Sequence, residues 1–173
     1  MSVPVALVGN PRPASRTLTA AVAAAEAVGR RTGHDGPPRV VDLSELAPLL
    51  LTGPSPQVEA ALETVAGAGV LVVASPTYKA TYTGLLKVFL DRLPPGALSR
   101  TVALPLLVMG DPRHALAVEL HLRPVLAELG AQVPTPGLAL LESQIPDLET
   151  ALAGWADRVA PQVAATPRER AEI

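Results

Sequence analysis

A chain of 173 residues with 49% apolar and 17% charged residues can bury one substantial core and is too apolar to be disordered. Its net charge of −2 gives no electrostatic footprint for nucleic acid, and the lack of cysteine excludes disulfides, thiolate metal sites and thiol redox chemistry. The sequence has no apolar run of membrane-spanning length and no basic-then-apolar signal at its N-terminus, so a cytoplasmic protein is expected.

Short apolar runs alternate with helical patterns along the chain, which indicates βαβ units and a parallel sheet. The first strand is expected over residues 3–8. A helix follows from Thr17 and is expected to end near Gly29 or Gly33. The second strand is expected over residues 39–43.

A short helix over residues 57–66 follows an irregular, proline-rich connection. Residues 70–74 form an unbroken apolar run, typical of a strand that is covered on both faces. The amphipathic helix after it has charged residues on one side and, on the other, apolar residues at helical spacing, which are Leu85, Leu86, Phe89, Leu90 and Leu93.

Two prolines interrupt the predicted elements of the second half. The fourth strand, residues 102–109, contains Pro105, which cannot donate to a ladder and therefore requires a bulge or an edge contact. A helix over residues 114–129 contains Pro124, which is expected to kink it. A fifth strand lies within residues 132–141.

The last helix is expected to bury a stripe formed by Leu148, Leu152, Trp155 and Val159. Residues 1–165 are interpreted as one domain, and the charged residues 166–173 as a frayed tail. The element order favours an α/β, flavodoxin-like three-layer sandwich, for which we assume a five-stranded parallel sheet in the order 2-1-3-4-5.

Three polar loops follow the expected first, third and fourth strands. In such a sheet the ligand binds beyond the carboxyl ends of these strands, where the strand order reverses, so the three loops are expected to converge. The middle loop carries Tyr78, Lys79 and Tyr82 in a chain with only 2% aromatic residues. This composition favours a planar ligand.

The three loops carry motifs that resemble the NAD(P)H-dependent FMN reductases of the flavodoxin-like superfamily, in particular those of sulfonate-monooxygenase systems. The motifs are Val8-Gly9-Asn10-Pro11-Arg12-Pro13-Ala14-Ser15-Arg16-Thr17-Leu18, residues 72–87 and residues 108–126. The resemblance runs in order through about residues 3–145 and implies transfer of hydride from NADPH or NADH to FMN. It also implies supply of reduced FMN to a partner flavin-dependent monooxygenase.

The resemblance assigns the FMN phosphate to the first loop, at Arg12, Ser15, Arg16 and Thr17. A helix N-terminus there would favour an anion, because its amides are unpaired and the helix dipole is positive at that end. In the alternative interpretation, Ser15 or Thr17 is an ordinary helix cap and the arginines are solvated surface residues.

The second loop is implied to line the flavin ring, mainly through backbone amides, at Pro76, Thr77, Tyr78, Lys79 and Ala80. Amides at the polar edge of the ring would stabilise the electron density of the reduced flavin. Tyr78 either packs near the ring or makes a surface contact.

The third loop departs from the family pattern. Gly110 would allow close backbone approach, but Asp111-Pro112-Arg113 replaces the second glycine or small residue that the family carries. Asp111 beside a reduced flavin would be unfavourable unless Arg113 pairs with it or it points outward. Asp111 then either hastens release of reduced FMN or is solvated without effect.

No catalytic side chain is nominated, because hydride transfer to a flavin depends on orientation more than on an acid or base. The histidines lack metal-ligand spacing, so no metal is expected. The alternatives are an FMN-bound quinone or azo reductase, or a non-enzymatic flavin-binding electron-transfer or partner protein.

A homo-oligomer, either a dimer or a tetramer, is expected chiefly from the family resemblance. Locally, Leu85, Leu86, Phe89 and Leu90, together with residues 116–122, offer more apolar surface than one face of a sheet requires. The alternative is that both helices are covered within the monomer.

Overall fold

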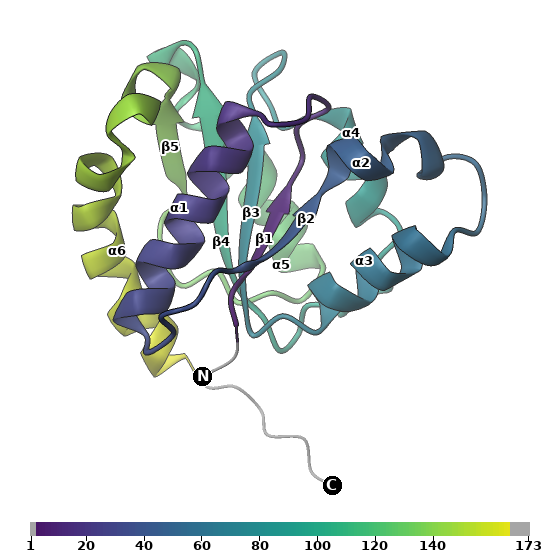
Figure 1. Ribbon diagram of the computed structural model, residues 1–173, viewed down its shortest axis with the longest axis horizontal. Helices are drawn as coiled ribbons and strands as arrows, with labels where there is room; N and C mark the ends of the chain where they lie inside the picture. The colour runs from purple at the N-terminus through teal and green to yellow at the C-terminus, as the bar shows by residue number, and fades with distance from the viewer. Residues whose placement is uncertain (1–2, 167–173) are drawn as a thin grey trace, which may run out of the picture.

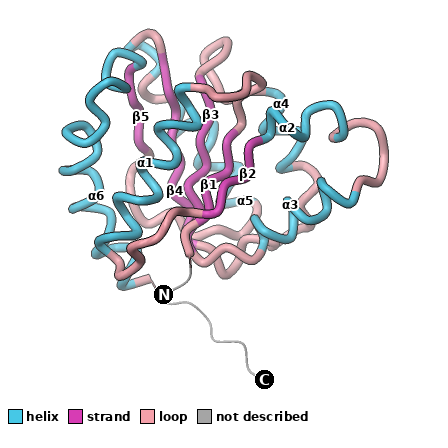
Figure 2. Tube along the Cα trace, viewed as in Figure 1, coloured by secondary structure: helices cyan, strands magenta, loops and turns pink. Residues whose placement is uncertain are grey.

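The computed structural model describes residues 3–166, which form a parallel sheet between two layers of helices (Figures 1 and 2). The strand order is β2-β1-β3-β4-β5, as predicted. The strands are β1 Val5–Val8, β2 Arg39–Asp42, β3 Val70–Pro76, β4 Val102–Met109 and β5 Leu138–Leu141. The helices are α1 Arg16–Arg31, α2 Leu43–Leu46, α3 Pro56–Ala66, α4 Gly84–Leu90, α5 Arg123–Glu128 and α6 Leu148–Ala165.

Every residue of β1, β3 and β4 is buried, because helices cover the sheet on both faces. On one face the core is built with α3, α4 and α5. On the other it is built with α1 and α6 (Figure 1). The face of α1 on the sheet is mainly alanine, with no exposed surface on Ala20, Ala21, Ala24 or Ala25, so this helix lies close to the strands.

The helix boundaries have local causes. Ser15 caps α1 by accepting a hydrogen bond from the Leu18 amide at 3.1 Å. The helix ends at Arg31, and Gly33 adopts a left-handed φ of 83°. Of the stripe predicted on α6, Leu152, Trp155 and Val159 are buried, whereas Leu148 is half-buried. Of the predicted tail, Thr166 closes α6 and residues 167–173 lie outside the described residues.

Pro105 lies inside β4 without a bulge, in register with Val73. Its nitrogen faces β5, because Ala103, two residues earlier, donates its N–H to the Gln132 carbonyl on that side. Paired β5 begins only at Leu138, which lies opposite Leu106. Pro105 therefore faces a stretch of backbone that requires no ladder hydrogen bond.

The expected helix over residues 114–129 is broken rather than merely kinked. A 3-10 turn, Pro112–His114, is followed by a π-helical turn, Val118–Leu122, and then by α5. The Arg123 N–H closes the π turn on the Val118 carbonyl. Pro124 then lies in the first turn of α5, where a missing N–H costs little.

The apolar side of α4 is core rather than free surface. Leu86, Phe89 and Leu90 are at most 1% exposed and belong to the cluster beneath α3 and α5. The sequence-based inference that they offer surface to a partner is therefore wrong, because helical periodicity identifies a buried face and not what buries it. Leu116 and Leu120 remain exposed, at 68% and 64%.

Gly9 ends β1 where the chain passes closest to α4. A Cβ at this position would lie 2.6 Å from the Leu86 Cβ, an atom that cannot move without its backbone. We expect Gly9→Ala to destabilise the protein by about 1–3 kcal/mol through overpacking, measured by urea denaturation. Gly84→Ala is the control, because nothing lies within 4 Å of its Cβ position, and an equal loss in both variants would contradict the steric explanation.

Candidate functional site

Three loops meet at the edge of the sheet where β1, β3 and β4 end (Figure 1). The strand register brings the ends together, with Val8 opposite Ala74 and Pro76 opposite Val108. The first loop spans residues 9–15, the second residues 77–83 and the third residues 110–117. This is the place that the strand order predicts for a ligand.

The first loop is organised by Asn10, a buried residue that sequence reasoning missed. Its side-chain amide donates to the Thr17 hydroxyl at 3.0 Å and its carbonyl oxygen accepts from the Arg12 amide at 3.0 Å. A polar residue directly after a buried strand was the available signal. Through Asn10 the loop is folded against the N-terminus of α1.

The four predicted phosphate residues gather at this helix end. Ser15 and Thr17 are buried, whereas Arg12 and Arg16 are exposed. Arg16 pairs with Glu142 at 2.6 Å. The capping role of Ser15 matches the alternative interpretation, although the first amides of α1 still point out of the helix toward the loop.

The second loop closes in a tight hairpin. The amide of Tyr78 donates to the Thr81 carbonyl at 2.8 Å, and the Thr81 amide donates back to Tyr78 at 3.2 Å. Between them Lys79 and Ala80 both have positive φ, at 51° and 66°, as in a type I′ turn. The Thr77 amide donates to Val108 of β4 at 2.8 Å. Within residues 3–166, the amides of Lys79 and Ala80 therefore form no backbone hydrogen bond. Both are among the amides predicted to face the flavin.

Backbone strain is concentrated in these loops. Within residues 3–166, the non-glycine residues with positive φ are Ala14, Lys79 and Ala80, one in the first loop and two in the second. Each costs on the order of 1 kcal/mol relative to a right-handed conformation. Strain of this kind clusters at functional sites, where the surrounding structure holds it in place.

Thr83 joins the first two loops. Its hydroxyl donates to the Gly9 carbonyl at 2.5 Å and accepts from the Leu86 amide at 3.2 Å, which also caps α4. The Thr83 amide donates to the Ser75 hydroxyl at 3.0 Å, and that hydroxyl donates to the Pro76 carbonyl. All of these polar groups are buried.

In the third loop, Asp111 caps the 3-10 turn and pairs with Arg113, with 2.7 Å between the Asp111 Oδ2 and an Arg113 terminal nitrogen. The hydrogen bonds from Arg113 lower the pKa of Asp111 from 3.8 to about 2. An acid beside a reduced flavin was expected to be unfavourable unless Arg113 paired with it. The structure contains this pair.

The residues of the three loops fit FMN, with its phosphate at the first loop and its ring between the other two. The helix N-terminus suits the phosphate. The Thr77 hydroxyl is buried without a hydrogen-bond partner, and nothing lies within 4 Å of a Cβ placed on Gly110.

Over residues 3–166, no cluster of three or more acidic or histidine side chains suits a metal ion. In the same range no helix is long and apolar enough to cross a membrane.

A family model described as NADPH-dependent FMN reductase matches residues 4–144, most of the chain. The chain belongs to this family. It is therefore a flavodoxin-like oxidoreductase, as the three loop motifs indicated.

Members of the NADPH-dependent FMN reductase family resemble it along much of its length. An FMN reductase (NADPH) of Escherichia coli strain K12 is 38% identical over 146 residues, 83% of this chain and 75% of the relative. An FMN reductase (NADPH) of Pseudomonas putida strain KT2440 is 42% identical over 91 residues, so the alignment spans 53% of this chain and 46% of that relative. The apo crystal structure of an NADH:FMN oxidoreductase (EMOB) superposes with a TM-score of 0.85 at 34% identity, covering 96% of this chain and 92% of that one.

The Asp111–Arg113 pair in this reductase can be tested by titration. We expect Arg113→Gln to raise the pKa of Asp111 from about 2 toward 3.8, because the side-chain hydrogen bonds that favour the carboxylate are lost while the backbone one remains. Carboxyl carbon chemical shifts between pH 3 and 6 measure the change. The wild-type group is expected to stay largely ionised at pH 3, and identical titration curves in both proteins would refute the pairing.

Proposed function

We propose that this protein reduces FMN with NADPH or NADH and that the three loops hold the flavin. One observation carries the proposal most strongly. The loops that match the family motifs converge at the strand-order reversal, with the N-terminus of α1, a place suited to an anion, on one side and the strained hairpin on the other. FMN supplies the chemistry when bound, since its ring accepts a hydride from a nicotinamide.

The residues of the chain would bind FMN and orient its ring. Arg12, Ser15, Arg16 and Thr17 would hold the phosphate with charge-assisted hydrogen bonds and α1 amides. Residues 76–80 would present the hairpin amides and the unpartnered Thr77 hydroxyl to the ring. Gly110 would leave room for close approach at the third loop, where the Asp111 carboxylate is paired with Arg113.

The activity itself is tested by anaerobic mixing of protein, FMN and each nicotinamide. Bleaching of the visible FMN absorbance by NADPH or NADH is expected, and failure with both would contradict the proposal. FMN that stays bound through gel filtration, together with faster reduction of a quinone or azo dye than of free FMN, would favour the prosthetic-group alternative.

The phosphate assignment is tested by comparing FMN with riboflavin, which has no phosphate. We expect the double variant Ser15→Ala, Arg16→Ala to weaken FMN binding by about 10-fold or more, because it removes charge-assisted hydrogen bonds, and to weaken riboflavin binding much less. Fluorescence titration measures both dissociation constants. Equal weakening of the two ligands would overturn the assignment.

Glu142→Gln supplies the matched control for this comparison. It removes the acid that pairs with Arg16 and leaves the arginine in place. FMN binding is expected to stay as tight as in the wild type or to become tighter, with riboflavin unchanged. Weakened FMN binding would contradict this exchange of partners, because it would mean that Glu142 positions Arg16 rather than competing with the phosphate for it.

We also propose that reduced FMN is released to a partner monooxygenase in the cytoplasm. The resemblance to sulfonate-system reductases supports the partner class. The exposed, charged third loop supports release, because an acid near the reduced ring disfavours its negative charge. The pairing of Asp111 with Arg113 makes this effect modest in the wild type.

A homo-oligomer completes the proposal, as a dimer or tetramer. Leu116, within the third loop, and Leu120, just after it, are large, exposed apolar side chains. We expect light scattering of the wild type to give a multiple of 17.8 kDa, and Leu116→Glu with Leu120→Glu to give the monomer, since charges at the contact would be buried unpaired. A wild-type mass of 17.8 kDa at micromolar concentration would contradict it.

A further inference from the structure

A cavity of about 520 Å³ lies between α6 and the segment that leads into β5. It is lined by Pro134, Thr135, Pro136, Gly137, Leu138, Ala139, Trp155, Arg158, Val159 and Gln162. The strand β5 runs toward the edge that carries the three loops, ending with Leu141 opposite Met109, so the lining segment lies upstream of that edge. None of the residues proposed to bind FMN lines this cavity.

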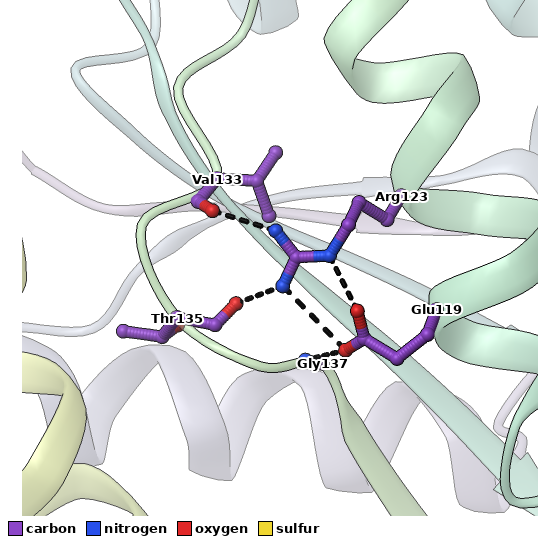
Figure 3. A network of polar contacts seen from close by, with 5 residues as sticks. All are labelled: Glu119, Arg123, Val133, Thr135 and Gly137. Atoms are coloured by element: carbon purple, nitrogen blue, oxygen red, sulfur yellow. Dashed lines mark hydrogen bonds and ion pairs between the residues drawn. The ribbon is translucent and has the colours of Figure 1, made fainter.

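Side chains of α5 and of the turn before it hold residues 133–137, of which residues 134–137 line the cavity (Figure 3). Arg123 donates to the carbonyls of Val133 and Thr135, and the Glu119 carboxylate accepts from both Arg123 and the Gly137 amide. These bonds use the backbone polar groups on the Arg123 side of the segment. This wall of the cavity, which contains two prolines, is therefore held in place before any ligand binds.

Two buried polar atoms of the lining residues lack partners. The Thr135 hydroxyl and the Trp155 indole N–H form no hydrogen bond, and each residue is only 6% exposed. An unpaired group of this kind is costly, so a ligand that supplies an acceptor would be favoured. Both atoms are shielded from solvent in the free protein, so a ligand reaches them only if these side chains move.

The remaining lining combines apolar surface with one cation. Pro134, Leu138 and Val159 supply aliphatic surface. Arg158 is exposed and belongs to none of the ion pairs found among residues 3–166. Donors beside aliphatic walls, without an acid in the lining, suit a ligand with an apolar body and an anionic acceptor.

We propose that this cavity is a second binding site, separate from the flavin site, for a short aliphatic monocarboxylate. The carboxylate would lie near Arg158 and Thr135, and the hydrocarbon would lie against Pro134, Leu138 and Val159. The volume is in the range of pockets that hold small organic ligands.

The test uses Trp155, the single tryptophan of the chain, as its own reporter. Hexanoate is titrated into the flavin-free protein while Trp155 emission is recorded, with hexanol and acetate as probes that each lack one half of the ligand. A saturable change is expected for hexanoate, with at least 10-fold weaker binding of hexanol and of acetate. A linear response to hexanoate, or equal binding of hexanol, would overturn the proposal.

Variants locate the site. Arg158→Gln is expected to weaken hexanoate about 10-fold, whereas Arg30→Gln, an exposed arginine on α1, leaves it unchanged. Thr135→Val is expected to weaken hexanoate several-fold while the melting temperature of the free protein stays the same or rises, because an unpaired hydroxyl is removed. Full hexanoate affinity in Arg158→Gln would refute the assignment.

Saturating FMN separates this site from the flavin site. The hexanoate dissociation constant is expected to be the same with and without FMN, and competition between the two would place hexanoate in the flavin loops and overturn the proposal. The result is independent of reductase activity, so either proposal can fail while the other stands.

Discussion

The Thr83 hydroxyl donates to the carbonyl at the end of β1 and accepts from the first turn of α4, so one buried oxygen fixes the relative position of two loops. Gly9 can approach α4 only because it has no Cβ, and Ser75 holds the Thr83 amide from below. These contacts exist without a ligand. The proposed flavin site is therefore organised before binding, which reduces the entropy that binding must overcome.

Two arginines near the proposed site already have partners in the free protein. Arg16 is bound to Glu142, which follows β5, and Arg113 is bound to Asp111 in its own loop. Arrival of a phosphate at the helix end would thus exchange one partner of Arg16 for another. The gain is a difference between two interactions, and it depends on how much water the phosphate excludes.

The sequence predicted what depends on local pattern. Strands such as β4 were found with their boundaries because helices bury them on both faces, which produces unbroken apolar runs. The positions of the three loops followed from strand order. The hydrogen bonds of Asn10 and Thr83 could not be predicted, because their partners are set by tertiary folding. The left-handed Lys79 and Ala80 were equally hidden, since no glycine or asparagine marks their turn.

The alanine face of α1 has a consequence for the end of that helix. Methyl groups at Ala20, Ala21, Ala24 and Ala25 act as a thin spacer between the helix axis and the sheet. A longer side chain at any of them would increase the distance between the helix and the sheet. The N-terminus of α1 would then move away from the end of β1. The abundance of alanine resembles a simple compositional bias. In α1, however, these small side chains set the distance of Ser15 and the first helix amides from the strands.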